Sequence, residues 1–326
     1  AVRRRSTIRF RRVTLRRWPR SGTFNRRERA PEIRAAMFGR SQGPGTPTAA
    51  SRPQLELSGP VLRRAFEALA EGAEDQGGVE RYVDALKLKS KVFKDALLGA
   101  DGSVAEISPA QFAPLCAFMP TVRRRVGTWL EEPAFAMMSD AISALLQPAG
   151  DTAGTDERLR LFGEAFPNNG KHRWVRDLGA ELLHNVDPER FPLMTRWVWD
   201  AETNTGVLRE IWFGDDVDHR RISARDDYET FLILREELSQ FLTDNGVFRD
   251  VMHFVDMLCA QVYANYICEQ GGSYLRADFS APEDPMQHTR RLLGLDGVRP
   301  RTGSRHSETI DGQAVHQDLL SLSRLD

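Results

Sequence analysis

Apolar residues recur every three or four positions along most of the chain between residues 57 and 296, a spacing that places them on one face of an α-helix. The clearest case is 247–269, where the apolar positions are separated by 4, 3, 4, 3 and 4 residues. These positions are Phe248, Met252, Val255, Cys259, Val262 and Tyr266. We expect this segment to be a long helix packed under several neighbours and ended by Gly271-Gly272.

The same periodicity predicts helices along the rest of this region. Prolines separate several of them, because proline lacks the N–H that a helix interior needs. Asp226 with Glu229 three residues later is typical of a capping box and predicts a helix start at Asp226. The other predicted helices are 58–72, 79–98, 108–119, 121–131, 133–147, 155–166 and 173–186, with a short turn at 290–295. The expected fold class is all-α, a multi-helix globular bundle.

The stretch 171–214 holds four of the six tryptophans, which predicts that it forms the centre of the core because aromatic side chains bury the most apolar surface. Its first helix, 173–186, places Trp174 and other apolar residues on one half and a polar set on the other. That polar set is Arg173, Asp177, Glu181 and His184, and we expect this half to be a solvated face. Segments 193–199 and 207–213 are better described as helices than as a hairpin turning at 203–206.

Composition divides the chain into four parts. Residues 1–55 form a basic arm that contains Gly and Pro, 56–150 and 151–296 are expected to be two helical subdomains, and 297–326 is a polar tail that should be loosely held. The boundary near 150 rests on the segment PAGDTAG. No apolar stretch is long enough for a membrane span, because polar residues interrupt the longest one, 251–267.

Charge is unevenly distributed. Residues 1–36 contain thirteen arginines and two glutamates, a net charge of +11, so the remainder carries −12 in a chain of net charge −1. Such a segment is expected to be disordered. It has three open interpretations: translated sequence upstream of a true start at Met37, a basic arm for nucleic acid or an acidic membrane, or an organelle transit peptide. An acidic body binds phosphates poorly, so any nucleic-acid contact falls to this arm.

Three scattered cysteines, Cys116, Cys259 and Cys268, are too few for a disulfide framework or a metal knuckle. The arm also lacks the apolar core of a secretory signal. A reduced, cytoplasmic location is therefore expected.

Motifs for metal binding, phosphate binding or nucleophilic catalysis are missing from the sequence, so we expect neither cofactor nor metal. The weak catalytic candidates are Lys171, His184, Asp187 and Arg196, all in or near the tryptophan-rich stretch. Other polar groups are interpreted as solvated helix faces, with anion or ligand binding as the alternative. These groups are Lys87, Lys89, Lys91 and Lys94, the triplet 123–125, and the pair His253 and Asp256.

The segment LLHNVDPERFPLMTRWVW, residues 182–199, resembles the 8-oxoguanine glycosylase-type fold, in which an apolar helix is followed by Asp-Pro, Phe-Pro and a further helix. In that family a catalytic Asp lies just beyond Phe-Pro and a Lys in an upstream hairpin attacks the sugar. Here Leu193, Met194 and Thr195 follow Pro192, with no Asp before Asp200, and Lys171 lacks the surrounding hairpin. The resemblance implies a helical fold and, as an expectation, association with DNA.

Two functions from different classes follow. The first is a soluble, non-enzymatic helical protein that binds a protein partner, which the excess of packing residues over chemical ones favours. The second is a nucleic-acid-associated protein or an enzyme with a polar cleft near the tryptophan cluster. A convergent set of ionisable groups in a concave pocket would favour the second function. The sequence indicates no small-molecule class.

Overall fold

A computed structural model of the protein describes residues 54–74, 77–147, 150–214, 219–274, 285–300 and 307–309. These residues belong to one compact unit, Pro53–Asp326. The basic arm and the start at Met37 lie outside the described residues, as does most of the polar tail. Among the helices described, none is long and apolar enough to cross a membrane.

The described chain is helical, which confirms the all-α class. Its helices are α1 (Gly59–Glu74), α2 (Val79–Leu97), α3 (Pro109–Cys116), α4 (Ala134–Leu146), α5 (Thr155–Glu164), α6 (Trp174–Val186), α7 (Val207–Glu210), α8 (Tyr228–Asp244), α9 (Val251–Tyr274) and α10 (Pro285–Leu292). Two short 3-10 helices, η1 (Gly127–Trp129) and η2 (Gly170–His172), lie between them. Within the described part of the tail, β1 (Val298–Pro300) pairs antiparallel with β2 (Ser307–Thr309), so that Arg299 faces Glu308.

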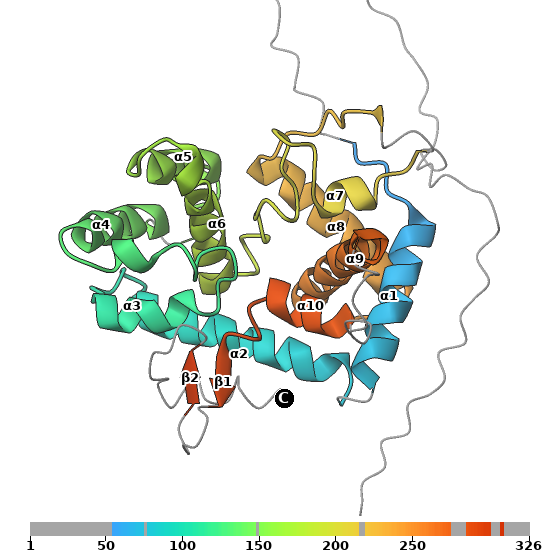
Figure 1. Cartoon of the computed structure of the whole chain (residues 1–326), viewed down its shortest axis with the longest axis horizontal. Helices are drawn as coiled ribbons and strands as arrows, with labels where there is room; N and C mark the ends of the chain where they lie inside the picture. The colour runs from blue at the N-terminus through green and yellow to red at the C-terminus, as the bar shows by residue number, and fades with distance from the viewer. Residues whose placement is uncertain are drawn as a thin grey trace, which may run out of the picture. The chain divides into compact units, whose positions relative to one another are not determined.

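Helix α9 is the centre of one group of helices, and α1, α7, α8 and α10 pack around it (Figure 1). We call these five helices the α9 group. Three members of the predicted stripe, Val255, Cys259 and Val262, are buried. Residues on the other sides are buried as well, including Met257, Leu258, Ala260 and Ala264. The middle of α9 is therefore buried on more than the one face that the apolar stripe predicts.

The predicted bounds of this helix were wrong at both ends. Asp250 has a left-handed backbone (φ 52°), so α9 begins at Val251 and leaves Phe248, a predicted core residue, 74% exposed. The helix also runs past Gly271-Gly272 to Tyr274. Glycine lowers helix propensity without preventing helix, and here it does not act as a terminator.

Helix α6 belongs to a second group, in which it packs against α4 and α5, while α2 contacts both α6 and α9 (Figure 1). Trp174 is buried, as predicted. The polar half of α6 was predicted to be solvated, and this was wrong: Asp177, Glu181 and His184 are all buried. Different segments bury these groups: Lys89 of α2 pairs with Glu181, Arg196 binds Asp177, and Asp256 of α9 contacts His184. The division into subdomains at residue 150 stays a prediction, although α4 and α5, on either side of it, pack together.

Segment 193–199 is not a helix, and 207–213 contains only the single turn of α7. The chain instead folds back on itself through an isolated antiparallel bridge between Asp200 and Thr205, closer to the hairpin alternative. The amide N–H of Val207 then donates to the Trp197 carbonyl at 3.0 Å. Gly206 (φ 120°) permits this return, since a Cβ there would lie 2.8 Å from the Val198 carbonyl oxygen. The helix implied by the glycosylase resemblance is therefore absent.

Two further expectations are corrected. Segment 121–131 forms turns and η1 in place of a regular helix. The cap of α8 is Asp227, whose side chain accepts from the Thr230 N–H, while the predicted cap, Asp226, forms an ion pair with Arg176. The carboxylate of Asp227 can cap the helix as well as that of Asp226, so the predicted helix start was wrong by one residue.

Candidate functional site

Ionisable side chains gather in the interior where α2, α6 and α9 meet. We call this set the junction cluster. It consists of Lys89 from α2, Glu181 and His184 from α6, and His253 and Asp256 from α9. Four of the five are buried and His253 is half-buried. Buried charges are costly unless they are paired, so each contact in the cluster bears on what the cluster does.

Lys89 and Glu181 form a buried ion pair. Lys89 Nζ lies 3.3 Å from Glu181 Oε2 and also donates to the Leu293 carbonyl at 3.0 Å. The same Oε2 accepts from the Asn185 amide at 3.0 Å. Each charge therefore has one opposite charge and one neutral hydrogen-bond partner, which offsets much of the cost of removing both charges from water.

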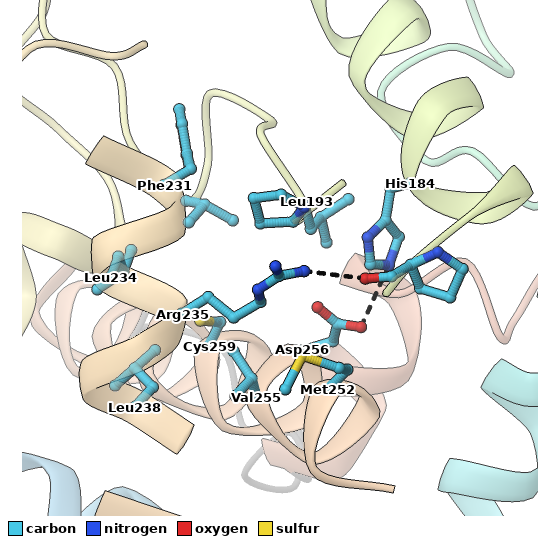
Figure 2. Close-up of a pocket in the computed structure, with 13 residues that line it drawn as sticks. His184, Leu193, Phe231, Leu234, Arg235, Leu238, Met252, Val255, Asp256 and Cys259 are labelled. Carbon is cyan, nitrogen blue, oxygen red and sulfur yellow. Dashed lines mark hydrogen bonds and ion pairs between the residues drawn. The ribbon is translucent and has the colours of Figure 1, made fainter. Parts of the chain in front are cut away.

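His184 bridges the two helix groups. Its Nδ1 lies 2.9 Å from the Phe191 carbonyl and its Nε2 lies 3.2 Å from Asp256 Oδ2 on α9. Figure 2 shows the imidazole reaching from α6 toward the Asp256 carboxylate. Burial opposes protonation of the ring, but the Asp256 carboxylate, the Phe191 carbonyl and Glu181 outweigh it and raise the pKa of His184. The arrangement thus favours a protonated imidazole.

Burial and the charges of this cluster also shift the pKa values of two other side chains on α9, those of His253 and Cys259. Burial, together with the charges of His184 and Lys87, lowers the pKa of His253 against the attraction of Asp256 and Asp250. Burial, reinforced by Asp256, strongly raises the pKa of the Cys259 thiol. Cys259 is therefore a protonated thiol and a poor nucleophile.

Two small cavities adjoin the cluster. One of about 20 Å³ lies between α8, α9 and the segment after α6, and is lined by His184, Arg235, Asp256 and Cys259 among others (Figure 2). A second of about 10 Å³ is lined by Lys89, Glu181, His253 and Asp256 among others. The larger has room for about one water molecule, and the smaller is at the lower limit of about 10–15 Å³ for holding one.

The four predicted site residues do not converge. Only His184 belongs to the junction cluster. Arg196 donates to both carboxylate oxygens of Asp177 at 2.7–3.3 Å, and Asp187, at the end of α6, pairs with Arg190. Lys171 is exposed in η2. The contacts described for Arg196 and Asp187 hold the chain around α6 in place, and neither residue faces a cavity described above.

Lys89, Glu181 and Asp256 were missed, although the sequence held a signal for one of them. Lys89 follows Leu86 by three residues and precedes Phe93 by four, so it lies on the inner face of α2. Arg123 was likewise predicted to lie on the surface and is buried, bound to Asp296 through both terminal nitrogens at 2.8 and 3.1 Å. For Glu181 and Asp256 the periodicity alone did not predict burial, because their burial depends on which helices cover them.

In the described part of the chain, no three His, Cys, Asp or Glu side chains are placed to hold a metal ion. The junction cluster is therefore a network of paired charges around water-sized cavities. Comparison of the chain with protein-family models, with curated proteins and with solved structures finds no match.

Proposed function

We propose that this protein acts by binding a protein partner, and that Phe248 anchors the contact. The observation that carries the proposal is the exposure of Phe248, whose side chain is 74% accessible in the turn between α8 and α9. Buried aromatic anchors dominate the binding energy of protein interfaces. The exposed ring of Phe248 is therefore available to be buried against a partner protein.

The turn that presents Phe248 has a fixed backbone. Gly246 (φ 93°) and Asp250 (φ 52°) are both left-handed, and such a conformation at a non-glycine residue persists only where its surroundings hold it. The Asp250 carbonyl accepts from the amides of His253 and Phe254 in the first turn of α9 at 3.0 and 3.2 Å, and its carboxylate lies 3.1 Å from Lys87 Nζ on α2. A ring on a preorganised turn loses little further backbone entropy on binding.

The junction cluster supports the same proposal indirectly. Its cavities of about 10 and 20 Å³ are far below the roughly 300–1,000 Å³ of ligand pockets. Its charges pair with one another across helices, which assigns them to the fold. A cytoplasmic location is part of this proposal, because three scattered cysteines provide no disulfide framework.

Site-specific photocrosslinking tests the proposal. A photoreactive phenylalanine analogue at position 248, in the source cells, should capture one discrete protein, and the same analogue at Phe213, which is 52% exposed on another surface segment, should not. With the captured protein purified, Phe248→Ala should weaken binding about 30-fold, the loss of roughly 2 kcal/mol expected of an anchor residue. Phe213→Ala is the matched control and should leave the affinity unchanged.

Equal capture from both positions, or an affinity that Phe248→Ala leaves unaltered, would contradict the proposal. Circular dichroism of Phe248→Ala must match that of the wild type, since an exposed side chain contributes little to the fold.

A further inference from the structure

The contact between His184 and Asp256 spans the two helix groups, because α6 packs with α4 and α5 while α9 is the centre of the other group. Both side chains are buried. The Oδ2 atom of Asp256 that faces His184 accepts no well-aligned hydrogen bond within the described residues. The positive charge of His184 is therefore the main compensation for this buried carboxylate.

Whether His184 can keep its contacts with both Phe191 and Asp256 depends on the number of protons on its imidazole ring. Nδ1 lies 2.9 Å from the Phe191 carbonyl, which can only accept, so Nδ1 must carry a proton. A neutral ring has one N–H, and Nε2 would then carry a lone pair 3.2 Å from the carboxylate. Only the protonated ring offers a donor to Phe191 and a positive charge to Asp256. When that proton is lost, His184 must give up either the Phe191 contact or the Asp256 contact.

We propose that the His184–Asp256 pair is a pH-sensitive latch, which holds α6 to α9 while the imidazole is protonated and loosens when the imidazole becomes neutral. The cavity of about 20 Å³ beside the pair already has room for a water molecule that could enter the junction as it opens. The latch is independent of the proposed partner binding through Phe248.

Charged and titratable groups face the pair from every helix packed against it. Lys89 and Glu181 compensate each other's charge. The negative charge of Asp256 is compensated by the positive charge of His184. Of the described residues at and after the end of α10, Leu292 and Leu293 contribute apolar side chains and the Leu293 carbonyl to this region. The facing groups are Lys87 and Lys89 on α2, Glu181 on α6, Arg235 on α8, and Asp250, His253, Asp256 and the Cys259 thiol at or on α9.

The direction of the pH response follows from linkage. Folding raises the pKa of His184 above its ordinary value of 6.5, so the latch is fully closed below pH 6.5 and opens as pH rises toward the raised pKa. Within that window the opening constant rises up to tenfold per pH unit. Folding lowers the pKa of His253, so its titration affects the opening constant below pH 6.5. Substitution of His253 is therefore a matched control for substitution of His184.

Hydrogen exchange of the full chain between pH 6 and 9, corrected for the intrinsic pH dependence, measures the opening. In the wild type, protection of residues 187–193 and 252–260 should fall by up to tenfold per unit within the window, while α4 keeps its protection. His184→Gln should abolish this pH dependence and His253→Gln should preserve it. A His184→Gln profile with the same pH dependence as that of the wild type would overturn the proposal.

If His184→Gln fails to fold, NMR titration of the wild-type imidazoles decides the question. The latch requires His184 to carry protons on both ring nitrogens at pH 6 and to titrate above 6.5. A neutral His184 ring at pH 6 would overturn the proposal.

Discussion

Replacing Lys89 by Met tests the buried ion pair between α2 and α6. Lys89 is 3% exposed, so the substitution keeps most of its volume and apolar stem but leaves Glu181 as a buried anion. Glu181 retains one neutral donor from a side chain, the amide of Asn185 at 3.0 Å. The Leu293 carbonyl also loses its bond to Lys89.

The expected cost can be worked from these contacts. Removing one partner of a buried ion pair costs roughly 3–5 kcal/mol, because the other charge stays buried without compensation. Removing both charges, in Lys89→Met with Glu181→Leu, leaves only neutral groups short of a partner, at about 1–3 kcal/mol each. The double variant should therefore be no less stable than Lys89→Met alone. The double-mutant cycle should then give a coupling at least equal to the cost of Glu181→Leu alone, about 3–5 kcal/mol.

Urea denaturation followed by circular dichroism measures these free energies of unfolding. Lys91→Met is the matched control, since Lys91 lies on the same helix with a side chain 70% exposed and pairs with Asp95 at the surface. Its loss should cost at most about 1 kcal/mol. If Lys89→Met costs no more than Lys91→Met, then Lys89 is solvated and the described burial of this pair is wrong.

Three further predictions concern the core, a tight turn and the arm. Trp174→Ala should cost roughly 3–5 kcal/mol in urea denaturation because the ring is 2% exposed, and an unchanged midpoint would refute its burial. Gly294→Ala should cost more than about 3 kcal/mol, since its Cβ would lie 2.0 Å from the Phe118 carbonyl oxygen, whereas Gly102→Ala, with a positive φ but open space, should cost about 1 kcal/mol. Deleting residues 1–36 should leave the melting temperature unchanged and abolish any salt-sensitive nucleic-acid binding; salt-insensitive binding by the truncated chain would contradict the assignment of such binding to the arm.

The helices themselves could be predicted from the sequence because local periodicity and proline positions determine them. The bounds of α6 and α4 differ from the prediction by one residue at each end, apart from the shared end of α6 at Val186. Segment 193–213 was mispredicted because its apolar residues satisfy a helical period, while the bridge between Asp200 and Thr205 uses the backbone groups that a helix would need. Such pairing is tertiary information that a period count cannot contain.

The candidate site was harder to predict for a related reason. A polar face opposite an apolar stripe is normally solvated, and this rule placed His184, His253 and Asp256 in water. In the structure neighbouring parts of the chain cover that face, so His184 and Asp256 become buried partners and His253 is half-buried. Lys89 shows that part of this information was present, in its spacing from Leu86 and Phe93, but its charge was given more weight than its position.

The central position of α9 has a consequence for how the chain is made. Helix α1 packs against α9, which is synthesised roughly 190 residues later, or about 10–40 s at the ordinary rates of translation. Until then α1, whose Leu62 and Leu69 are buried in the finished fold, lacks one of the helices that it packs against. The helices α4, α5 and α6 pack mainly on one another and on α2, all of which precede α9 in the chain. The α4–α6 group can therefore begin to assemble during synthesis, whereas α1 keeps apolar side chains exposed, and prone to aggregation, until α9 is made.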